Sequence, residues 1–365
     1  MDTSVVVVGG GIIGASIAWR LSQRGVRVTL LEAGTLGGEA SWAGAGMLAP
    51  GAEVTEESSW SGLALDSWRA YGDYVEELEN ESRETIDYRV CGAVEPAYSQ
   101  SEWRELELRA ERQERLGVPS VALTPEEALK RVLALNPANL VGALWYPADA
   151  IVNPRDVMKA LRVTLEQRGV LVRENVRVAA MAADAQGVRI LSGETEIRAE
   201  AAVLAAGAWA SAIAVSIAGE PWEGPRAYPI RGHLLGFDWA AGALGPLLRW
   251  NHTYLVQRAG GLLIVGTSEE DTGFERTVDP AIAAAIQQRA ARLLPGLGAE
   301  RPATIWTGFR PAIEASQPML GAIAGSRLWA AYGHYRNGIL MAPGTARLVA
   351  DGITSQLRDA SAETD

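Results

Sequence analysis

Apolar residues near the start of the chain form an unbroken run, Val5–Val8, which is followed at once by glycines. A β-branched run without polar interruption is typical of a strand buried on both faces of a parallel sheet. Apolar side chains then recur at helical spacing as far as Leu21, and Gly25 marks the expected end of that helix. A second apolar strand follows over residues 26–31. The pattern predicts a strand–helix–strand unit.

Similar patterns recur in two later parts of the chain. Asn153 supplies a helix N-cap, Pro154 fits the first helical position, and apolar spacing continues this helix to Gly169. The next expected elements are short strands over residues 170–172, 176–181, 188–191 and 201–206. The last part consists of an expected strand at 328–332, a loop at 333–338 and a helix at 339–353. Together with the N-terminal unit, these parts predict one nucleotide-binding domain.

Two stretches with a different pattern of apolar and polar residues separate these parts. Residues 60–150 contain charged helical runs, whereas residues 225–270 alternate apolar and polar positions as short strands do. We interpret them as a second domain inserted in two pieces, which makes the expected fold class α/β. The predicted boundaries are residues 1–82, 150–222 and 303–365 for the nucleotide-binding domain, and residues 83–149 and 223–302 for the substrate domain.

Composition narrows the classes of function. A net charge of −11 argues against an extended nucleic-acid surface, which needs clustered Lys and Arg. The single cysteine, Cys91, excludes a disulfide within the chain, and a histidine metal site would require all three widely spaced histidines to converge. No apolar run approaches the ~20 residues that span a bilayer, and the N-terminus lacks signal-peptide features. We therefore expect a cytoplasmic protein without a metal.

The glycines after the first strand match the dinucleotide pattern G-x-G-x-x-G. Gly9 permits the tight turn, Gly11 lets the backbone approach a pyrophosphate, and Gly14 brings helix and strand together. Glu32 lies 18 residues after Gly14, at the end of the second strand, where a carboxylate can bind ribose hydroxyls. Such an acid disfavours NADP. A glycine-rich turn in another α/β protein is the alternative, and the motif alone does not separate NAD from FAD.

Small residues continue over positions 37–48, without a helical or strand period. Small side chains over such a length let the backbone lie against a flat ligand. The alternative is a flexible linker, but Trp42, Met47 and Leu48 are costly to leave in water. This segment therefore favours FAD.

Four segments of the chain resemble the D-amino acid oxidase superfamily of FAD-dependent oxidoreductases, and within it the glycine oxidase family of the thiamine-thiazole pathway. They span nearly the whole chain in family order, and they are residues 8–14 with Glu32, 43–48, 306–311 and 333–343. The last is the most specific, because in this family it covers the isoalloxazine ring. The resemblance implies non-covalent FAD in a Rossmann-like domain of the glutathione-reductase type, with an α+β substrate domain on an antiparallel sheet.

The same resemblance implies a reaction. A glycine-like substrate, such as glycine, sarcosine, another N-alkylglycine or a D-amino acid, would pass a hydride to flavin N5, and O2 would be reduced to H2O2. A dehydrogenase with a quinone or protein acceptor is the nearest alternative. A modified tRNA base as substrate, a non-catalytic flavin-binding protein and an NAD-dependent dehydrogenase are more distant ones. Family members are often oligomers, so a homodimer or homotetramer is expected.

The resemblance also assigns roles to side chains. Arg310 can hold a substrate carboxylate through two parallel hydrogen bonds, and Tyr254 would add a third contact. Arg336 would line the site, and Met47 would pack near its edge. The alternatives are a salt bridge for Arg310 and core packing for Tyr254 and Met47. The expected cofactor-binding residues are Gly9, Gly11, Ile13, Gly14, Glu32, Ala33, Ser41, Gly46, Met47, Val176, Gly207, His334, Arg336, Asn337, Gly338 and Ile339.

Two departures from the family pattern affect the site. Glu269 stands where relatives usually carry an apolar residue, so that it could shrink or acidify the pocket, admit a basic side chain, or point into solvent. No cysteine follows Cys91, whereas covalently flavinylated relatives have one late in the chain. FAD is therefore expected to be removable. The N-terminus of the helix at 339–353 is expected to stabilise negative charge on the reduced flavin.

Overall fold

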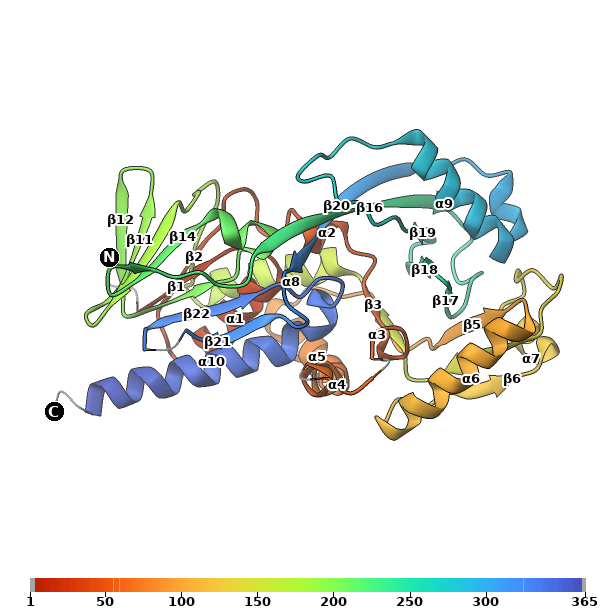
Figure 1. Ribbon diagram of the computed structural model, residues 1–365, viewed down its shortest axis with the longest axis horizontal. Helices are drawn as coiled ribbons and strands as arrows, with labels where there is room; N and C mark the ends of the chain where they lie inside the picture. Colours follow the sequence, from red (N-terminus) through yellow and green to blue (C-terminus); the bar gives the residue numbers. More distant parts are fainter. Residues whose placement is uncertain (1–3, 55, 59, 324, 363–365) are drawn as a thin grey trace.

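The protein is described from a computed structural model, which covers residues 4–54, 56–58, 60–323 and 325–362, with side chains as far as residue 359. Figure 1 shows an elongated molecule with helices and sheets at one end and a further large sheet at the other. The N and C labels lie beside the helices and smaller sheets, and two long strands run from this part of the molecule to the large sheet.

The sheet nearest the chain ends has six strands in the order β21-β22-β13-β1-β2-β9. Val5 of β1 lies opposite Ala201 on one side and Val28 on the other, and all neighbours are parallel except β21 and β22. The predicted buried parallel strand is therefore confirmed. The strands are β1 (Val5–Val8), β2 (Val28–Leu31), β9 (Leu171–Arg173), β13 (Ala201–Leu204), β21 (Met319–Ala322) and β22 (Leu328–Tyr332).

The two faces of β1 are buried by different layers. Val5 and Val7 join the core beneath the helices, whereas Val6 and Val8 face a second sheet, as the alternation of a strand requires. The helices are α1 (Ile12–Gln23), α8 (Pro154–Gln167) and α10 (Gly338–Ala362). The second sheet consists of β12 (Thr195–Ala199), β11 (Gly187–Ser192), β10 (Ala180–Asp184), β14 (Ala214–Ile217) and β15 (Glu220–Pro221).

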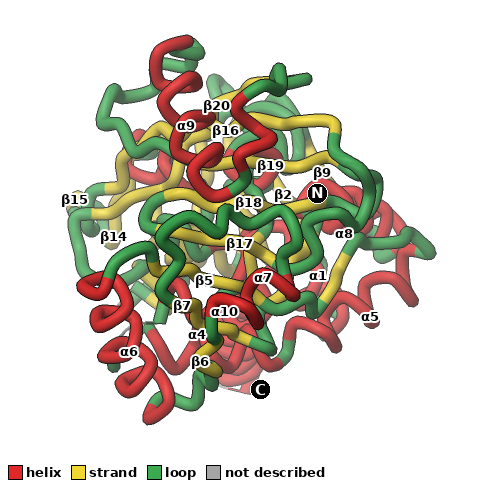
Figure 2. The backbone as a smooth tube through the Cα atoms, turned by 90° about the vertical axis from the view of Figure 1, so that its right-hand side faces the viewer, coloured by secondary structure: helices red, strands yellow, loops and turns green. Residues whose placement is uncertain are grey.

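An eight-stranded sheet forms the other end, and its strands are antiparallel except for β17 and β5. In order they are β20 (Thr304–Ile313), β16 (Ala227–Asp238), β19 (Leu262–Gly266), β18 (Thr253–Gln257), β17 (Leu247–Trp250), β5 (Ala93–Ala97), β7 (Gly142–Tyr146) and β6 (Val121–Leu123). Its helices, on the side that faces the viewer in Figure 2, are α9 (Pro280–Leu293), α6 (Gln100–Arg115) and α7 (Pro125–Arg131).

The remaining described elements are a small sheet and six helices. A three-stranded sheet is formed by β3 (Met47–Leu48), β8 (Ala150–Val152) and β4 (Tyr88–Arg89). The other elements are α2 (Ala40–Ala43), α3 (Pro50–Glu53), α4 (Ser61–Arg69), α5 (Tyr71–Ser82), and the 3-10 helices η1 (Gly207–Ala212) and η2 (Pro295–Gly298).

The α/β fold class is confirmed, while several predicted bounds differ. The helix predicted over 339–353 continues to Ala362, because residues 354–362 contain neither Pro nor Gly. The strand predicted over 176–181 begins only at Ala180, and residues 176–179 line a cavity. The domain boundaries stay a prediction. Strand β20, just after the predicted boundary at 303, pairs with β16 along its length.

Candidate functional site

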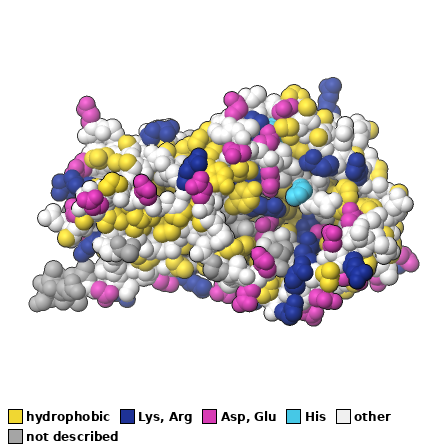
Figure 3. Space-filling view, in the orientation of Figure 1, with side chains coloured by type: hydrophobic (Ala, Val, Ile, Leu, Met, Phe, Trp, Pro, Cys, Tyr) yellow, Lys and Arg dark blue, Asp and Glu magenta, His cyan; other side chains and the backbone are white. Residues whose placement is uncertain are grey.

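A cavity of about 890 Å³ runs between the six-stranded sheet and the eight-stranded sheet. Figure 3 shows hydrophobic side chains gathered near the middle of this face, with charged side chains of both signs around them. Seventeen of the predicted site residues line the cavity, and Gly14 is the exception. Residues far apart in the chain, from Gly9 to Ile339, thus meet around one space.

Gly9 and Gly14 pack more closely against backbone atoms than a residue with a side chain would allow, whereas Gly11 leaves space. Gly9 has a φ of +109°, and a Cβ there would lie 2.4 Å from the carbonyl oxygen of Ala205. A Cβ on Gly14 would lie 1.9 Å from the carbonyl oxygen of Gly9. Gly14 therefore brings α1 against the turn, although it does not reach the cavity. A Cβ on Gly11 would meet only the Ser41 hydroxyl, at 3.4 Å, so Gly11 leaves room on the cavity side.

Glu32 is held at the end of β2 by backbone hydrogen bonds. Its two carboxylate oxygens accept hydrogen bonds of 2.7 Å each, one from the N–H of Gly10 and one from the N–H of Gly34. A carboxylate oxygen can accept more than one hydrogen bond, so Glu32 keeps acceptor capacity at the cavity wall. Its position is therefore set before any ligand arrives.

The small-residue segment 37–48 is fixed rather than flexible. The Ser41 hydroxyl accepts a 2.9 Å hydrogen bond from the N–H of Ile12, in the first turn of α1. Gly46 has a φ of +74°, and a Cβ there would lie 1.9 Å from the carbonyl oxygen of Val152. The flexible-linker alternative therefore does not describe this segment, and its backbone forms one wall of the cavity.

Arg310 lies on β20 with its guanidinium anchored to a neighbouring loop. Nη1 donates to the carbonyl oxygen of Ser268 at 3.0 Å, and Nη2 donates to the Thr267 hydroxyl at 2.8 Å. Gly232, on the adjacent strand, leaves the necessary space, because a Cβ there would lie 2.5 Å from Nη1. Among the residues that the structure describes, no carboxylate lies within salt-bridge distance of Arg310, so the salt-bridge alternative finds no support.

Two further predicted side chains lie close to Arg310. Tyr254 also lines the cavity, and burial raises the pKa of its hydroxyl, which the positive charge of Arg310 partly offsets. The hydroxyl therefore stays protonated near neutral pH and can donate a hydrogen bond. Met47 is half-buried on β3 and lines the same cavity.

Arg336 is paired with carboxylates on two sides. Its Nη2 lies 3.1 Å from Oε1 of Glu53, and its Nη1 lies 3.5 Å from Oε1 of Glu269. The three possibilities for Glu269 stay predictions; the structure shows its carboxylate beside Arg336, with the side chain 40% exposed. Glu53 was not predicted, because nothing in the sequence around 50–53 indicates that it meets residue 336.

The loop before α10 contributes buried polar groups. The His334 ring is buried, Nε2 lies 3.1 Å from the Thr345 hydroxyl, and burial lowers the pKa of His334 to about 4. His334 is therefore neutral at physiological pH. Oδ1 of Asn337 is buried and, within the described residues, has no hydrogen-bond partner. Because Asn337 lines the cavity, a ligand could satisfy this atom.

A network behind Arg310 fixes the loop that it contacts. Glu270 accepts hydrogen bonds from Arg231 and, at 2.7 Å, from the Ser268 hydroxyl, and it lies 2.8 Å from Nδ1 of His233. Nε2 of His233 accepts the N–H of Asp279 at 2.9 Å. Because Nε2 accepts this hydrogen bond, Nδ1 is the nitrogen that can donate to Glu270. The network thus holds Ser268, whose carbonyl oxygen accepts the hydrogen bond from Arg310.

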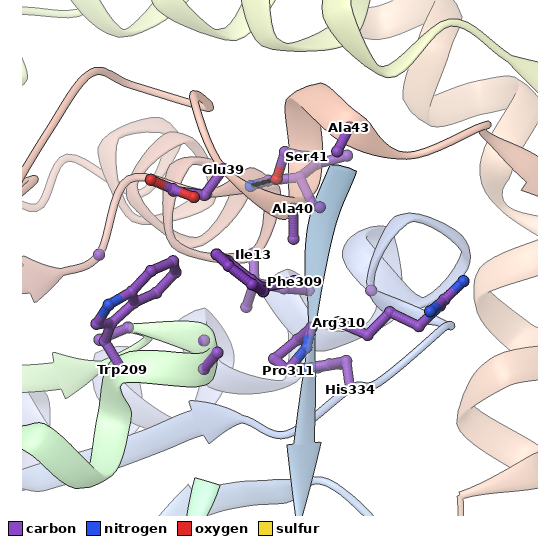
Figure 4. A pocket seen from close by; sticks show the side chains of 18 of the residues that line it. Ile13, Glu39, Ala40, Ser41, Ala43, Trp209, Phe309, Arg310, Pro311 and His334 are labelled. Carbon is purple, nitrogen blue, oxygen red and sulfur yellow. Dashed lines mark hydrogen bonds between the residues drawn. The ribbon is translucent and has the colours of Figure 1, made fainter. Parts of the chain in front are cut away.

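Several lining residues were missed by sequence reasoning. The rings of Trp209 and Phe274 stack with centroids 4.7 Å apart, and Arg276 bonds to Glu39 at 2.6 Å. Figure 4 places Trp209 and Glu39 on one side of Phe309 and Arg310 on the other. Residues 268–279 have no strand or helix period, so no pattern could have predicted that their loop reaches the segment around residue 39.

Metal centres and membrane spans can be judged for the residues that the structure describes. In the described part of the chain, no group of three or more His, Cys, Asp or Glu side chains could hold a metal ion. Over the same ranges, no helix combines the length and the apolar character needed to cross a bilayer.

Comparison with known proteins identifies relatives over nearly the whole chain. A family model described as FAD dependent oxidoreductase (DAO) matches residues 4–352. The chain is 33% identical to a bifunctional protein ThiO/ThiG of Synechocystis over 97% of its length, but this covers only 52% of that protein. It is also 33% identical to a glycine oxidase of Geobacillus kaustophilus, covering 95% of this chain and 92% of the relative.

Solved structures give the same result. The crystal structure of glycine oxidase from Geobacillus kaustophilus superposes with a TM-score of 0.90 at 31% identity, over 97% of this chain and 95% of that one. The chain thus spans nearly the full length of the glycine oxidase of Geobacillus kaustophilus but only about half the length of the bifunctional relative.

Proposed function

The chain belongs to the DAO family of FAD-dependent oxidoreductases, and from this membership we propose that it oxidises glycine or a related small amino acid at the carbon that bears the amine. The observation that carries the proposal is the Arg310 guanidinium, which faces the cavity beside Tyr254 without a carboxylate partner among the described residues. Such a cation is suited to an anionic ligand.

The residues that line the cavity fit FAD. The unpartnered Oδ1 of Asn337, the space left by Gly11 and the fixed carboxylate of Glu32 each suit a part of a large polar cofactor. Glu32 would hold a ribose, the first turn of α1 would hold the pyrophosphate, and the start of α10 would hold the ring system. When bound, FAD supplies an acceptor for two electrons from the substrate.

Arg310 would bind the substrate carboxylate. A guanidinium has five N–H groups, and those that donate to Ser268 and Thr267 fix its orientation and leave others for the ligand. Two parallel hydrogen bonds would define both the position and the rotation of a carboxylate. The protonated Tyr254 hydroxyl would add a donor.

A catalytic base is not required from the side chains near Arg310. Burial raises the pKa of Tyr254, so its hydroxyl keeps its proton, and burial lowers the pKa of His334 to about 4, so this ring accepts a proton only weakly near neutral pH. The substrate would therefore react as the free amine, having released its ammonium proton to water. The N-terminus of α10, beginning at Gly338 on the cavity wall, would stabilise negative charge by ~0.3–2 kcal/mol.

We propose molecular oxygen as the electron acceptor, with hydrogen peroxide as the product, because relatives of nearly equal length are named oxidases. A quinone or protein acceptor is the second candidate. We also propose a cytoplasmic homo-oligomer, and the two-domain division with boundaries near residues 82, 150, 222 and 303.

The test is an anaerobic titration of the purified flavoprotein with glycine, sarcosine and D-alanine, followed by admission of air. Bleaching of the flavin band and rapid recovery with peroxide would support an amine oxidase. Recovery only with an added quinone would favour the dehydrogenase. A yellow protein that none of the three amines bleaches would overturn the proposed function while leaving FAD binding in place.

A further inference from the structure

The two arginines at the substrate end of the cavity have opposite surroundings. Arg310 faces only neutral acceptors, whereas Arg336 lies between the carboxylates of Glu53 and Glu269, at 3.1 and 3.5 Å. One cation with two anions leaves the group around Arg336 with a net charge of −1. The cavity is therefore positive at Arg310 and negative at Arg336.

Tyr254 is half-buried and lines the same cavity as Arg310, Arg336 and Glu53. The pKa of Tyr254 responds to the charges of Arg310, Arg336 and Glu53 together. A ligand held by Arg310 next to Tyr254 would therefore sense the charge around Arg336 as well.

Hydrogen bonds from a buried side chain hold the segment that carries Glu53. The buried side chain of Gln113 donates hydrogen bonds to the carbonyl oxygens of Gly51 and Val54, at 2.8 and 2.9 Å. These bonds fix the backbone on both sides of Glu53. Its carboxylate is 14% exposed and lines the cavity.

Glu269 is held by its neighbours in the loop. Ser268 binds Arg310 through its carbonyl oxygen, and Glu270 forms the ion pair with Arg231, so the backbone is anchored on either side of Glu269. Its side chain also interacts with Tyr335, and it is 40% exposed. The second carboxylate therefore lies against Arg336 and Tyr335, which themselves line the cavity.

We propose that the cavity selects amino acids with a single carboxylate, and that Glu269 sets the discrimination against substrates with a second anionic group. Arg336 and Glu53 alone would balance each other, so it is Glu269 that makes this end negative. This inference rests on the proposed function, because it assumes that the first carboxylate binds Arg310. A substrate whose far end is neutral or cationic meets no penalty.

Sarcosine and iminodiacetate form a matched pair of substrates for the test. Both are N-substituted glycines, and iminodiacetate carries a second carboxylate where sarcosine has a hydrogen of its methyl group. The measurement is kcat/KM for each amine with the wild-type flavoprotein and with Glu269→Gln. We expect the ratio of iminodiacetate to sarcosine to be low in the wild type and to rise about tenfold in the variant, since removing a nearby charge has an effect of this order.

Asp271→Asn is the matched control, because it removes one negative charge from the same loop. We expect this variant to change the ratio less than twofold, since Asp271 does not form an ion pair with Arg336. Glu269→Met provides a second variant that removes the charge without an amide, should Glu269→Gln fold poorly. Flavin content and thermal denaturation of each variant show whether it has folded.

Binding of the two amines to the oxidised flavoprotein, followed through the flavin spectrum, gives a reading that does not need turnover. The inference is overturned if wild-type protein prefers iminodiacetate or treats the pair equally, or if the ratio of dissociation constants is the same in Glu269→Gln. It is also overturned if Asp271→Asn changes the ratio as much as Glu269→Gln does. Failure of the proposed function is a different result, in which both amines perturb the flavin spectrum but neither bleaches it.

Discussion

The indole Nε1 of Trp306 donates a 3.0 Å hydrogen bond to the carbonyl oxygen of Ala43. This bond connects β20, which carries Arg310, to the small-residue segment that lines the cofactor end of the cavity. Both partners are buried. The contact therefore joins the strand that carries Arg310 to the small-residue segment 37–48.

Replacement of Trp306 by Phe removes this bond and leaves a buried carbonyl oxygen without its donor. A cost of about 1–2 kcal/mol is expected for such a loss, and we expect the dissociation constant of FAD to rise about fivefold. Titration of the apoprotein with FAD, followed by fluorescence, measures it. Trp329→Phe is the control, because its indole bonds to Gln356 near the end of α10, outside the cavity lining. An equal loss of FAD affinity in both variants would argue against the proposed connection.

Replacement of Arg310 by Lys keeps the charge but removes the paired N–H groups. We expect kcat/KM for glycine to fall by about two orders of magnitude, corresponding to about 2–3 kcal/mol. Flavin content should stay at the wild-type level, which absorbance at the flavin band reports. Wild-type kcat/KM in Arg310→Lys would contradict a paired contact with the substrate carboxylate.

Gly14→Ala tests the packing of the first helix against the glycine turn. Its Cβ would lie 1.9 Å from a backbone oxygen, so helix and turn must separate, and we expect a loss of about 2–3 kcal/mol in the free energy of unfolding. FAD affinity should fall with it. Gly62→Ala, also within a helix, adds a Cβ that meets nothing within 4 Å and is expected to stabilise by about 0.5–1 kcal/mol. Denaturant unfolding compares the two, and a loss of equal size in both would refute the packing argument.

The lowered pKa of the buried His334 ring predicts how the free energy of unfolding depends on pH. Burial lowers the pKa of His334 to about 4, below the value of about 6.5 in an unfolded chain. The unfolded state therefore binds the proton first, so stability is complete above about pH 6.5 and is lost progressively as the pH falls toward 4. The full effect is on the order of 3 kcal/mol.

His334→Gln should flatten the stability curve between pH 4 and 6.5, while His252→Gln, at an exposed position, should leave it unchanged. Urea unfolding at several pH values provides the free energies. Parallel curves for wild type and His334→Gln would show that this ring is not the group responsible.

Local patterns in the sequence predicted the parts of the fold that depend on neighbouring residues. The run Val5–Val8, the glycine turn and Glu32 lie within one strand–helix–strand unit, so their spacing alone determines how they meet. The positions of Arg310 and Tyr254 in the cavity came instead from the family resemblance. Neither spacing nor composition would have placed them there.

Contacts between distant segments could not be predicted. Glu53 reaches Arg336 across 283 positions, and Arg276 reaches Glu39 across 237. Such pairs depend on how loops close over the cavity, and an exposed or half-buried charge has no periodic pattern that reveals its partner. Glu269 was noticed only as a departure from the family, and its direction toward Arg336 required the structure.

Strand β20 has a consequence for how the reaction geometry is kept. Trp306, Gly308 and Arg310 alternate along one strand, so they share a face, and Trp306 and Gly308 both contact Ala43. Trp306 and Arg310 are separated by four residues of extended chain, or roughly 13 Å. The strand therefore keeps Arg310 at a fixed distance from the small-residue segment around Ala43. If the two ends of the molecule shift slightly, Arg310 would move together with the segment around Ala43, and the distance between the proposed substrate and cofactor sites would stay constant.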